Sequence, residues 1–408
     1  MSEQQTTLKR TLNLPMLIFY GVGVTIGAGI FALIGEAMLI AGNKAPIGFV
    51  VAGIIAAATG LSYAKLAAVY PRAAGEAVFV NIGMGPNWAR LVGIGVTITA
   101  IVSSAVIALS FAGYLGQLIT IPAPILVLAI LVTMATIACL GVTHSVIFAA
   151  IVTTIELGAL IVIVWFGAEH LTVPANWVNG LAPPTDFSLW PAIFSASLLA
   201  FFAFVGFEDI ENMAEETIDP HINVPRAIIG TLIITVLIYA LVALVAVSAP
   251  NPDAVANSEA PLATLFAQLT GGNGDLIAAA ATIAMVNGIL VQIVMASRVM
   301  FGMGKEGLLP KAISKLHPTR QTPIRATILV TVLIAILALI FPLGGLARTT
   351  SAVILVVFTL VNFSLWRIGS RKDAAPSLQR WKLLGLVGAF LSAGLLAIEM
   401  INQLSNWT

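Results

Sequence analysis

The chain has 408 residues, of which 59% are hydrophobic and only 9% are charged, and its mean hydropathy is +1.03. This composition excludes a soluble domain of this length and indicates a polytopic α-helical membrane protein. The formal net charge of +1 identifies no partner, because the distribution of charge along the chain matters more than its sum. The apolar runs are continuous and do not alternate, which excludes a closed β-barrel.

Eleven apolar segments are long enough to cross a bilayer, because about 20 helical residues span the ~30 Å hydrocarbon core. The expected spans are 15–40, 46–70, 90–118, 123–142, 145–167, 190–213, 226–248, 275–303, 324–341, 345–367 and 382–403. The loops at 168–189 and 249–274 contain no lysine or arginine and are expected to cap the outer side. The polar N-terminus lacks a small-residue cleavage site and is not interpreted as a signal peptide.

Lysine and arginine are distributed unevenly between the two sides of the predicted bundle. All of the 19 basic residues except Lys44 and Arg348 fall in or beside the loops on the N-terminal side. Because basic residues are retained on the cytoplasmic side, we expect a multi-pass protein of the cell membrane with a cytoplasmic N-terminus. Eleven spans would then place the C-terminus outside.

The first apolar segment carries four glycines near its centre, in Gly21-Val22-Gly23-Val24-Thr25-Ile26-Gly27-Ala28-Gly29-Ile30-Phe31. Glycine is a poor helix former, and irregular backbone at membrane depth is tolerated only where it is buried in protein or lines a cavity. Freed amides of a second half-helix would hold an anion, and freed carbonyls of the first half would hold a cation, which suggests a zwitterionic ligand. Close helix packing through small residues is the alternative interpretation, and both stay open here.

The sixth segment has a second irregularity, in Phe201-Phe202-Ala203-Phe204-Val205-Gly206-Phe207-Glu208-Asp209. Two interrupted helices five spans apart predict an inverted-repeat transporter whose site lies where the broken helices meet. The expected fold is an all-α membrane protein with a five-plus-five helix core. Its expected parts are a cytoplasmic N-terminal segment (1–14), a first five-helix repeat (15–167), a second repeat (190–367), and a further helix with the C-terminus (368–408).

Several stretches are similar to those of a known family. Residues 25–31 resemble the first-helix signature of the amino acid–polyamine–organocation (APC) superfamily. The other similar stretches are 61–76, 201–209 with 215–216 and 223–227, 297–303 and 306–310. Together they lie in family order between residues 14 and 330, whereas the last two spans match only by hydropathy and position. Family members commonly have twelve spans, so the missing twelfth span bears on the oligomeric state.

The resemblance implies a transporter of amino acids or related amines that works by alternating access. By position, backbone amides around 27–29 would meet the substrate carboxylate, and carbonyls near Thr25, Phe202 and Val205 would meet its ammonium group. Phe202 occupies the place of an aromatic gate in related exchangers, although an ordinary packing role is the alternative. Gln292 falls where some relatives have a substrate-facing side chain. The expected substrate-binding residues are Thr25, Ile26, Gly27, Ala28, Gly29, Phe202, Val205 and Gln292.

Ionisable residues inside the predicted spans are candidates for function, because charge at membrane depth is costly. Glu156 lies in the middle of the fifth span, where several proton-coupled relatives carry a lysine; it is a candidate for ion coupling, with a structural hydrogen bond as the alternative. Glu208 follows the second break and is expected to shape a gate or to bind a cationic substrate. Asp209 is expected to be a helix-end charge, and Glu399 has no predicted role. The group expected to be solvated comprises Glu211, Glu215, Glu216 and Asp219.

Other functional classes fit the sequence less well. It contains neither an HExxH motif nor a paired-aspartate motif, and its four His and one Cys leave little for metal catalysis, so no enzyme, metal or cofactor is expected. A channel would need polar rings along a continuous pore. We therefore expect an amino acid transporter, by symport or antiport, with neutral substrates favoured and H⁺ preferred to Na⁺ as coupling ion. A cationic amino acid or polyamine exchanger and a non-transporting sensor are the alternatives; the expected partners are the substrate and the lipid bilayer, with no nucleic acid.

Overall fold

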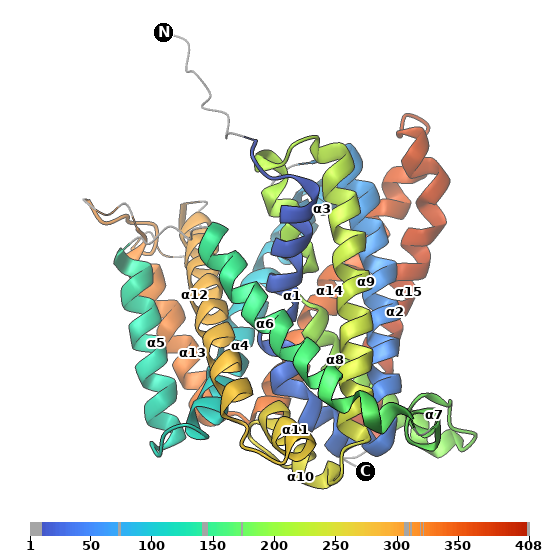
Figure 1. The fold of residues 1–408 in the computed structure, drawn as a ribbon. Coiled ribbons are helices and arrows are strands. Elements are labelled where there is room, and N and C mark those ends of the chain that lie inside the picture. Colours follow the sequence, from blue (N-terminus) through green and yellow to red (C-terminus); the bar gives the residue numbers. More distant parts are fainter. Residues whose placement is uncertain are drawn as a thin grey trace.

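A computed structural model describes residues 10–71, 75–140, 146–172, 174–305, 310, 312–318, 320 and 322–405 (Figure 1). The long helices are α1 (Leu14–Ala41), α2 (Ala45–Val69), α4 (Pro86–Gly116), α5 (Ala123–Leu140), α6 (Val146–Gly167), α8 (Trp190–Phe201), α9 (Pro220–Val247), α12 (Asp275–Lys305), α13 (Ile324–Ile340), α14 (Leu343–Gly369) and α15 (Pro376–Ser405). The shorter ones are α3 (Gly75–Met84), α7 (Pro174–Leu181), α10 (Pro252–Ala256), α11 (Pro261–Thr270) and the 3₁₀ helices η1 (Gly42–Lys44), η2 (Ala168–Thr172), η3 (Phe187–Leu189), η4 (Phe202–Phe204) and η5 (Phe207–Glu216). The all-α prediction is confirmed.

Each of the eleven expected segments corresponds to one long helix or, for the sixth, to α8 with η4 and η5. Nine stretches of the described residues are long and apolar enough to span a membrane, the first of which contains both α1 and α2. Helix α13 is slightly shorter, at 17 residues. Helix α1 begins and α15 ends at opposite ends of the bundle, as an odd number of crossings requires (Figure 1). Which end faces the cytoplasm stays a prediction.

Local sequence explains where α1 begins. Asn13 precedes it with an extended backbone, and its side-chain Oδ1 accepts a hydrogen bond from the Met16 N–H at 3.1 Å. Such a cap satisfies one of the amides that a helix leaves free in its first turn. Pro15 occupies the first turn, where the missing N–H costs no hydrogen bond.

Four of the five pairs of helices at equivalent positions of the two halves pack against each other. Helix α1 contacts α8, α2 contacts α9, α4 contacts α12, and α5 contacts α13. This pairing agrees with the five-plus-five core expected from the two breaks. Helix α15 packs outside this core against α14, α2 and α8.

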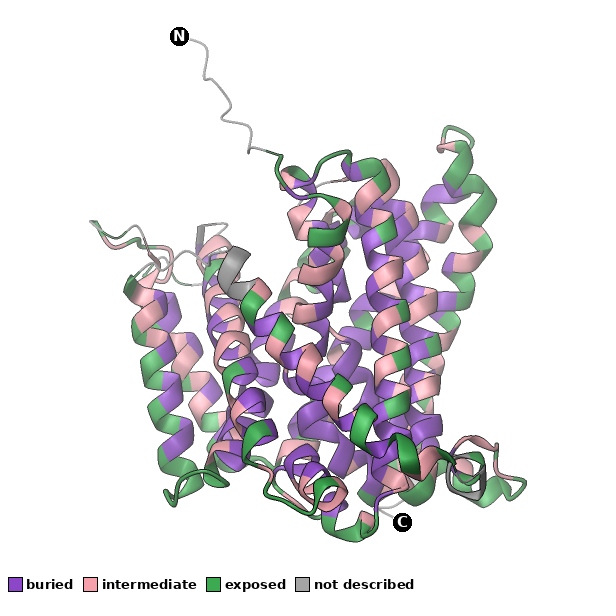
Figure 2. Ribbon diagram, viewed as in Figure 1, coloured by how far each residue is buried: buried purple, intermediate pink, exposed green. Residues whose placement is uncertain are grey.

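Burial follows the same arrangement. Buried residues concentrate along α1 and α8 in the middle of the bundle, whereas exposed residues follow the outer faces of α5 and α15 (Figure 2). Many exposed side chains there are large and apolar, including Val132 at 62% and Phe390 at 78% exposure. Large exposed apolar surface is expected where a helix meets lipid acyl chains.

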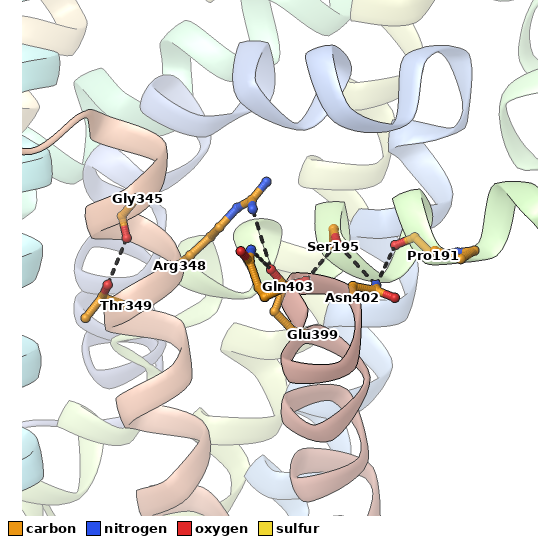
Figure 3. A network of polar contacts seen from close by, with 8 residues as sticks. All are labelled: Pro191, Ser195, Gly345, Arg348, Thr349, Glu399, Asn402 and Gln403. Carbon is orange, nitrogen blue, oxygen red and sulfur yellow. Dashed lines mark hydrogen bonds and ion pairs between the residues drawn. The ribbon is translucent and has the colours of Figure 1, made fainter. Parts of the chain in front are cut away.

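A polar network attaches α15 to the core and gives Glu399 a structural role (Figure 3). One carboxylate oxygen of Glu399 lies 3.5 Å from Arg348 on α14 and accepts a hydrogen bond from Gln403 at 2.8 Å. The other oxygen accepts a hydrogen bond from the Ser195 hydroxyl on α8 at 2.7 Å. Asn402 adds a bond to the main-chain oxygen of Pro191 at 3.2 Å. The C-terminal end of α15 is therefore fixed to both α8 and α14.

Candidate functional site at the two helix breaks

The break in α1 lies at Gly27, whose φ of 16° and ψ of −139° are not helical. The residues on either side are buried, with Ile26 at 0% and Ala28 at 5% exposure. A Cβ built on Gly27 would nevertheless meet no atom within 4 Å. The side-chain hydroxyl oxygen of Thr25 is also buried and has no hydrogen-bond partner. The predicted interruption is thus confirmed, and its glycine faces space that no protein atom fills.

The break in the sixth segment lies between η4 and η5. Val205 has an extended backbone. Gly206 has a φ of 126°, a backbone conformation that residues other than glycine rarely adopt. The N–H of Val205 donates to the Phe202 carbonyl at 3.1 Å, which closes η4. The predicted second interruption is therefore confirmed at Gly206.

The two breaks touch each other through their backbones. A Cβ on Gly29 would lie 2.5 Å from the Cα of Ala203, and one on Gly206 would lie 2.9 Å from the main-chain oxygen of Val24. Only hydrogen at these two positions permits such an approach. Gly29 thus serves close packing, the alternative considered for the sequence, whereas Gly27 faces open space.

Tyr239 on α9 joins the two breaks, a role that was not predicted from the sequence. Its hydroxyl oxygen lies 2.9 Å from the Thr25 carbonyl and 2.8 Å from the Ala203 carbonyl. Its ring packs edge-on against Phe204 at a centroid distance of 5.0 Å. A buried tyrosine hydroxyl needs a polar partner. The one tyrosine in the apolar stretch 226–248 was therefore the only sequence feature that could have indicated such a hydrogen bond.

The remaining predicted substrate-binding side chains come from η4, the second break and α12. Phe202 is 6% exposed, and Val205 is half-buried. Gln292 lies on α12, which packs against α1, α4 and α6, and its Oε1 atom is buried without a hydrogen-bond partner. The structure brings α1 into direct contact with both η4 and α12.

Glu156 is buried on α6, at 2% exposure, and its Oε2 atom has no hydrogen-bond partner. Thr153, three residues earlier, faces α1, since a Cβ on Gly23 would overlap its hydroxyl. Residues three apart share one face of a helix, and α6 packs against α1. The Glu156 carboxyl therefore faces α1 about one turn further along than Gly23, near the level of the break.

Glu208 has a structural partner at the second break. Its Oε2 atom accepts a hydrogen bond from the N–H of Gly206 at 2.8 Å, and the side chain is 5% exposed. The carboxylate thus caps the beginning of η5, where free amides favour an anion. Asp209 is half-buried and accepts a hydrogen bond from Asn212 at 3.3 Å, also near the beginning of η5.

The expectation of a solvated acidic group is wrong for one member. Glu215 and Asp219 are exposed and Glu216 is intermediate, but Glu211 is only 1% exposed. Its carboxylate accepts a hydrogen bond from the main-chain N–H of Glu76 at 2.9 Å. The physical reason is that α3, which was not predicted as a helix, covers this part of η5.

Comparisons with known proteins agree with this architecture. The family model described as amino acid permease matches residues 12–407. An uncharacterised transporter of Mycobacterium tuberculosis is 30% identical over 402 residues, which are 97% of this chain and 88% of that protein. A branched-chain amino acid permease of Bacillus subtilis is 27% identical, covering 91% of this chain and 83% of its own length. A cationic amino acid transporter of Arabidopsis thaliana, named as mitochondrial, is 30% identical and is covered over 62% of its length.

The matched family extends over both helix breaks and all eleven long segments. This chain belongs to the amino acid permease family, within the APC superfamily that the sequence motifs indicated. It is a multi-pass membrane protein for amino acid transport.

Proposed function

We propose that this permease is a secondary active transporter that moves amino acids across the cell membrane by alternating access. The supporting observation is the direct backbone contact of two interrupted helices from opposite halves, at Gly29 with Ala203 and at Gly206 with Val24. In inverted-repeat transporters the substrate lies where such helices meet, and the halves rock around it. The segments on either side of Gly27 and Gly206 would then tilt separately while the contact between the breaks persists.

Main-chain groups of the first break would hold the substrate's carboxylate. The amides around 27–29 begin the second half of α1, and a helix N-terminus favours an anion. The ammonium group would approach the carbonyls near Thr25 and Val205, sharing the Thr25 oxygen with the Tyr239 hydroxyl. Phe202, buried beside the second break, would close over the substrate, and the Glu208 cap would hold η5 in position as this gate moves.

Neutral amino acids are the preferred substrate class, because apolar side chains dominate both breaks. The similarity to a branched-chain amino acid permease agrees with this preference. A cationic amino acid or polyamine exchanger is the second candidate. It is favoured by the buried carboxyl of Glu156 near the first break and by the similarity to plant and human cationic amino acid transporters. A sensor that binds without transporting is the third.

The coupling ion is proposed to be H⁺, with Na⁺ as the second candidate. Glu156 carries this proposal, because a buried carboxylate without a donor at Oε2 must take up a proton or find a cation. Gln292 would contribute its unpartnered Oε1 to the substrate or to a water molecule.

Binding and flux together test this function. The purified protein is screened by thermal shift against the common amino acids and polyamines, and each stabilising compound is then tested for uptake into proteoliposomes. The variant Gly27→Val places its added Cβ where no other part of the protein lies within 4 Å, and it should raise the Kd of the substrate by about tenfold or more.

Gly93→Val is the matched control, since a Cβ at Gly93 in α4 also meets no atom within 4 Å and the position lies away from both breaks. Its affinity should match that of the wild type. Unchanged uptake by Gly27→Val would remove the first break from the substrate site. Binding without flux in the wild type would identify a sensor.

A further inference from the structure

Two glutamates at the end of the bundle where α1 begins form a carboxyl pair. Glu76 lies in the first turn of α3, and Glu211 lies on η5, the half of the sixth segment that follows Gly206. Their exposures are 8% and 1%, respectively. Burial of two carboxyls side by side is costly unless hydrogen bonds or opposite charges compensate.

The Glu211 carboxylate lies against the backbone at the beginning of α3. Its Oε1 atom accepts a hydrogen bond from the Glu76 N–H at 2.9 Å. A Cβ on Gly75 would overlap the same carboxylate, so only glycine fits this contact. The first turn of a ten-residue helix supplies partial positive charge to the anion. This explains how one carboxylate is held, but the second carboxyl still lacks a compensating partner.

The carboxyl groups of the two residues also act on each other directly. Two ionised carboxylates buried together repel each other, and a proton bound between them removes this repulsion. The Oε2 atom of Glu211 is buried and has no hydrogen-bond partner among the described residues. A proton shared by the carboxyl pair supplies the missing donor.

Among the described residues, the surroundings contain further acids, and neither glutamate of the pair takes part in an ion pair. Glu208 and Asp209 on η5 act electrostatically on the pair, and Tyr63 on α2 has a buried hydroxyl without a hydrogen-bond partner beside them. Arg371 contacts α3 at its other end, where it donates to the Ile82 carbonyl at 2.6 Å. Among the described residues, Arg348 with Glu399 is the ion pair that the structure shows, and it lies elsewhere.

We propose that Glu76 and Glu211 bind one shared proton and thereby form a latch that holds α3 against η5. The latch is a proton site separate from Glu156. Loss of the shared proton would place two negative charges in contact and free the backbone at the start of α3. Because η5 is one half of the interrupted sixth segment, release of the latch would free that half to move.

The direction of the pH dependence follows from the Glu76 carboxyl. Burial raises its pKa above the ordinary value, although hydrogen bonds with Glu211 and within Glu76 itself lower it in part. The pKa of Glu76 is therefore higher in the closed latch than in the open form, and the closed latch keeps its proton up to a higher pH. Its closing equilibrium is complete below the ordinary pKa of glutamate and weakens as pH rises towards the pKa of the closed form, by up to about tenfold per pH unit.

Hydrogen–deuterium exchange tests the latch without any substrate, so its failure is separate from failure of the proposed transport function. Exchange of the α3 amides is measured by mass spectrometry from mildly acidic to mildly alkaline pH, with the intrinsic pH dependence of exchange removed. The wild type should lose protection in the first turn of α3 as pH rises. Glu76→Gln should keep it at every pH, because the amide donates a hydrogen bond to Glu211 without titrating.

Three further variants control the experiment. Glu211→Gln should also give a flat profile, since its amide can donate to Glu76, and it repeats the test if Glu76→Gln folds poorly. Glu76→Ala should lose protection at every pH. Glu215→Gln alters an exposed residue of the same helix and should behave as the wild type. A flat wild-type profile, or a wild-type slope retained in both glutamine variants, would overturn the latch.

Discussion

A single hydroxyl proton at Tyr239 lies within reach of two main-chain acceptors, one from each interrupted helix. A tyrosine O–H donates one hydrogen bond at a time, so the Thr25 and Ala203 carbonyls compete for it. A buried carbonyl without a donor costs about 1–3 kcal/mol. The tyrosine therefore stabilises the junction of the breaks but leaves an acceptor that a substrate ammonium group can satisfy.

Tyr239→Phe removes that donor while keeping the ring against Phe204. We expect it to lower the free energy of unfolding by about 1–3 kcal/mol and also to change substrate affinity. Tyr114→Phe is the matched control, because the Tyr114 hydroxyl donates to the Phe31 carbonyl of α1 at 2.8 Å, outside the break. Thermal unfolding and substrate titration of both variants provide the measurement. Equal effects of the two variants on affinity would show that Tyr239 has only a structural role.

Single acidic residues show where sequence reasoning succeeds and where it ends. Glu156 was singled out because a charge within an apolar span is visible in the sequence, and the structure confirms its burial. Glu211 was expected to be solvated because it lies at the predicted cytoplasmic end of the sixth span. Its burial depends on α3 folding back over η5, a long-range contact that hydropathy does not report. Glu399 was unexplained because its partner Arg348 lies on another helix.

At the scale of elements, the eleven long segments and both breaks could be predicted from the sequence. Continuous apolar runs define spans locally, and glycines such as Gly27 and Gly206 mark interruptions without knowledge of the fold. The short helices α3, α7, α10 and α11 were not predicted. Each lies in a connection and is stabilised by the helices it covers, so its own sequence carries a weak signal.

The attachment of α15 leads to a prediction for this helix. Glu399→Ala removes a carboxylate that joins Arg348 and Ser195, and we expect a loss of about 1–2 kcal/mol, between the values for exposed and buried pairs, because the Arg348 side chain is 32% exposed. Thermal unfolding midpoints of Glu399→Ala, Arg348→Ala and the double variant form a double-mutant cycle. Strictly additive losses would mean that the ion pair contributes nothing, and that the hydrogen bonds to Ser195 and Pro191 on α8 hold α15 at this point.

At the scale of the whole molecule, the two basic residues that lie apart from the others both have partners. The Lys44 ammonium group donates to the carbonyls of Asn179 and Ala182 around the end of α7, and Arg348 pairs with Glu399. The remaining basic residues retain the asymmetry that predicts a cytoplasmic N-terminus. At the end of the bundle where α15 ends, Lys44 is therefore bound by main-chain carbonyls and Arg348 by a carboxylate.

Coupling is also a property of the whole molecule and is tested at that scale. Glu156→Gln fixes the neutral form of the side chain, so uptake into proteoliposomes should lose its dependence on an imposed pH gradient. Exchange of substrate for substrate needs no net proton movement and should retain most of the wild-type rate. Identical pH profiles of wild type and variant would exclude Glu156 as the proton carrier, and a strict Na⁺ requirement of the wild type would identify the other ion.

The pairing of helices across the two halves also determines when the protein can complete its core. Tyr239 and the Thr25 carbonyl that it contacts are 214 residues apart, and ribosomes add about 5–20 residues per second. Helix α1 is therefore synthesised on the order of 10–40 s before its partner on α9. During that interval the carbonyls at the Gly27 break have no tyrosine donor, so the first half must be inserted without its final contacts. A chain that stops before α9 lacks the residue that joins the breaks and is expected to be recognised as incomplete by cellular quality control.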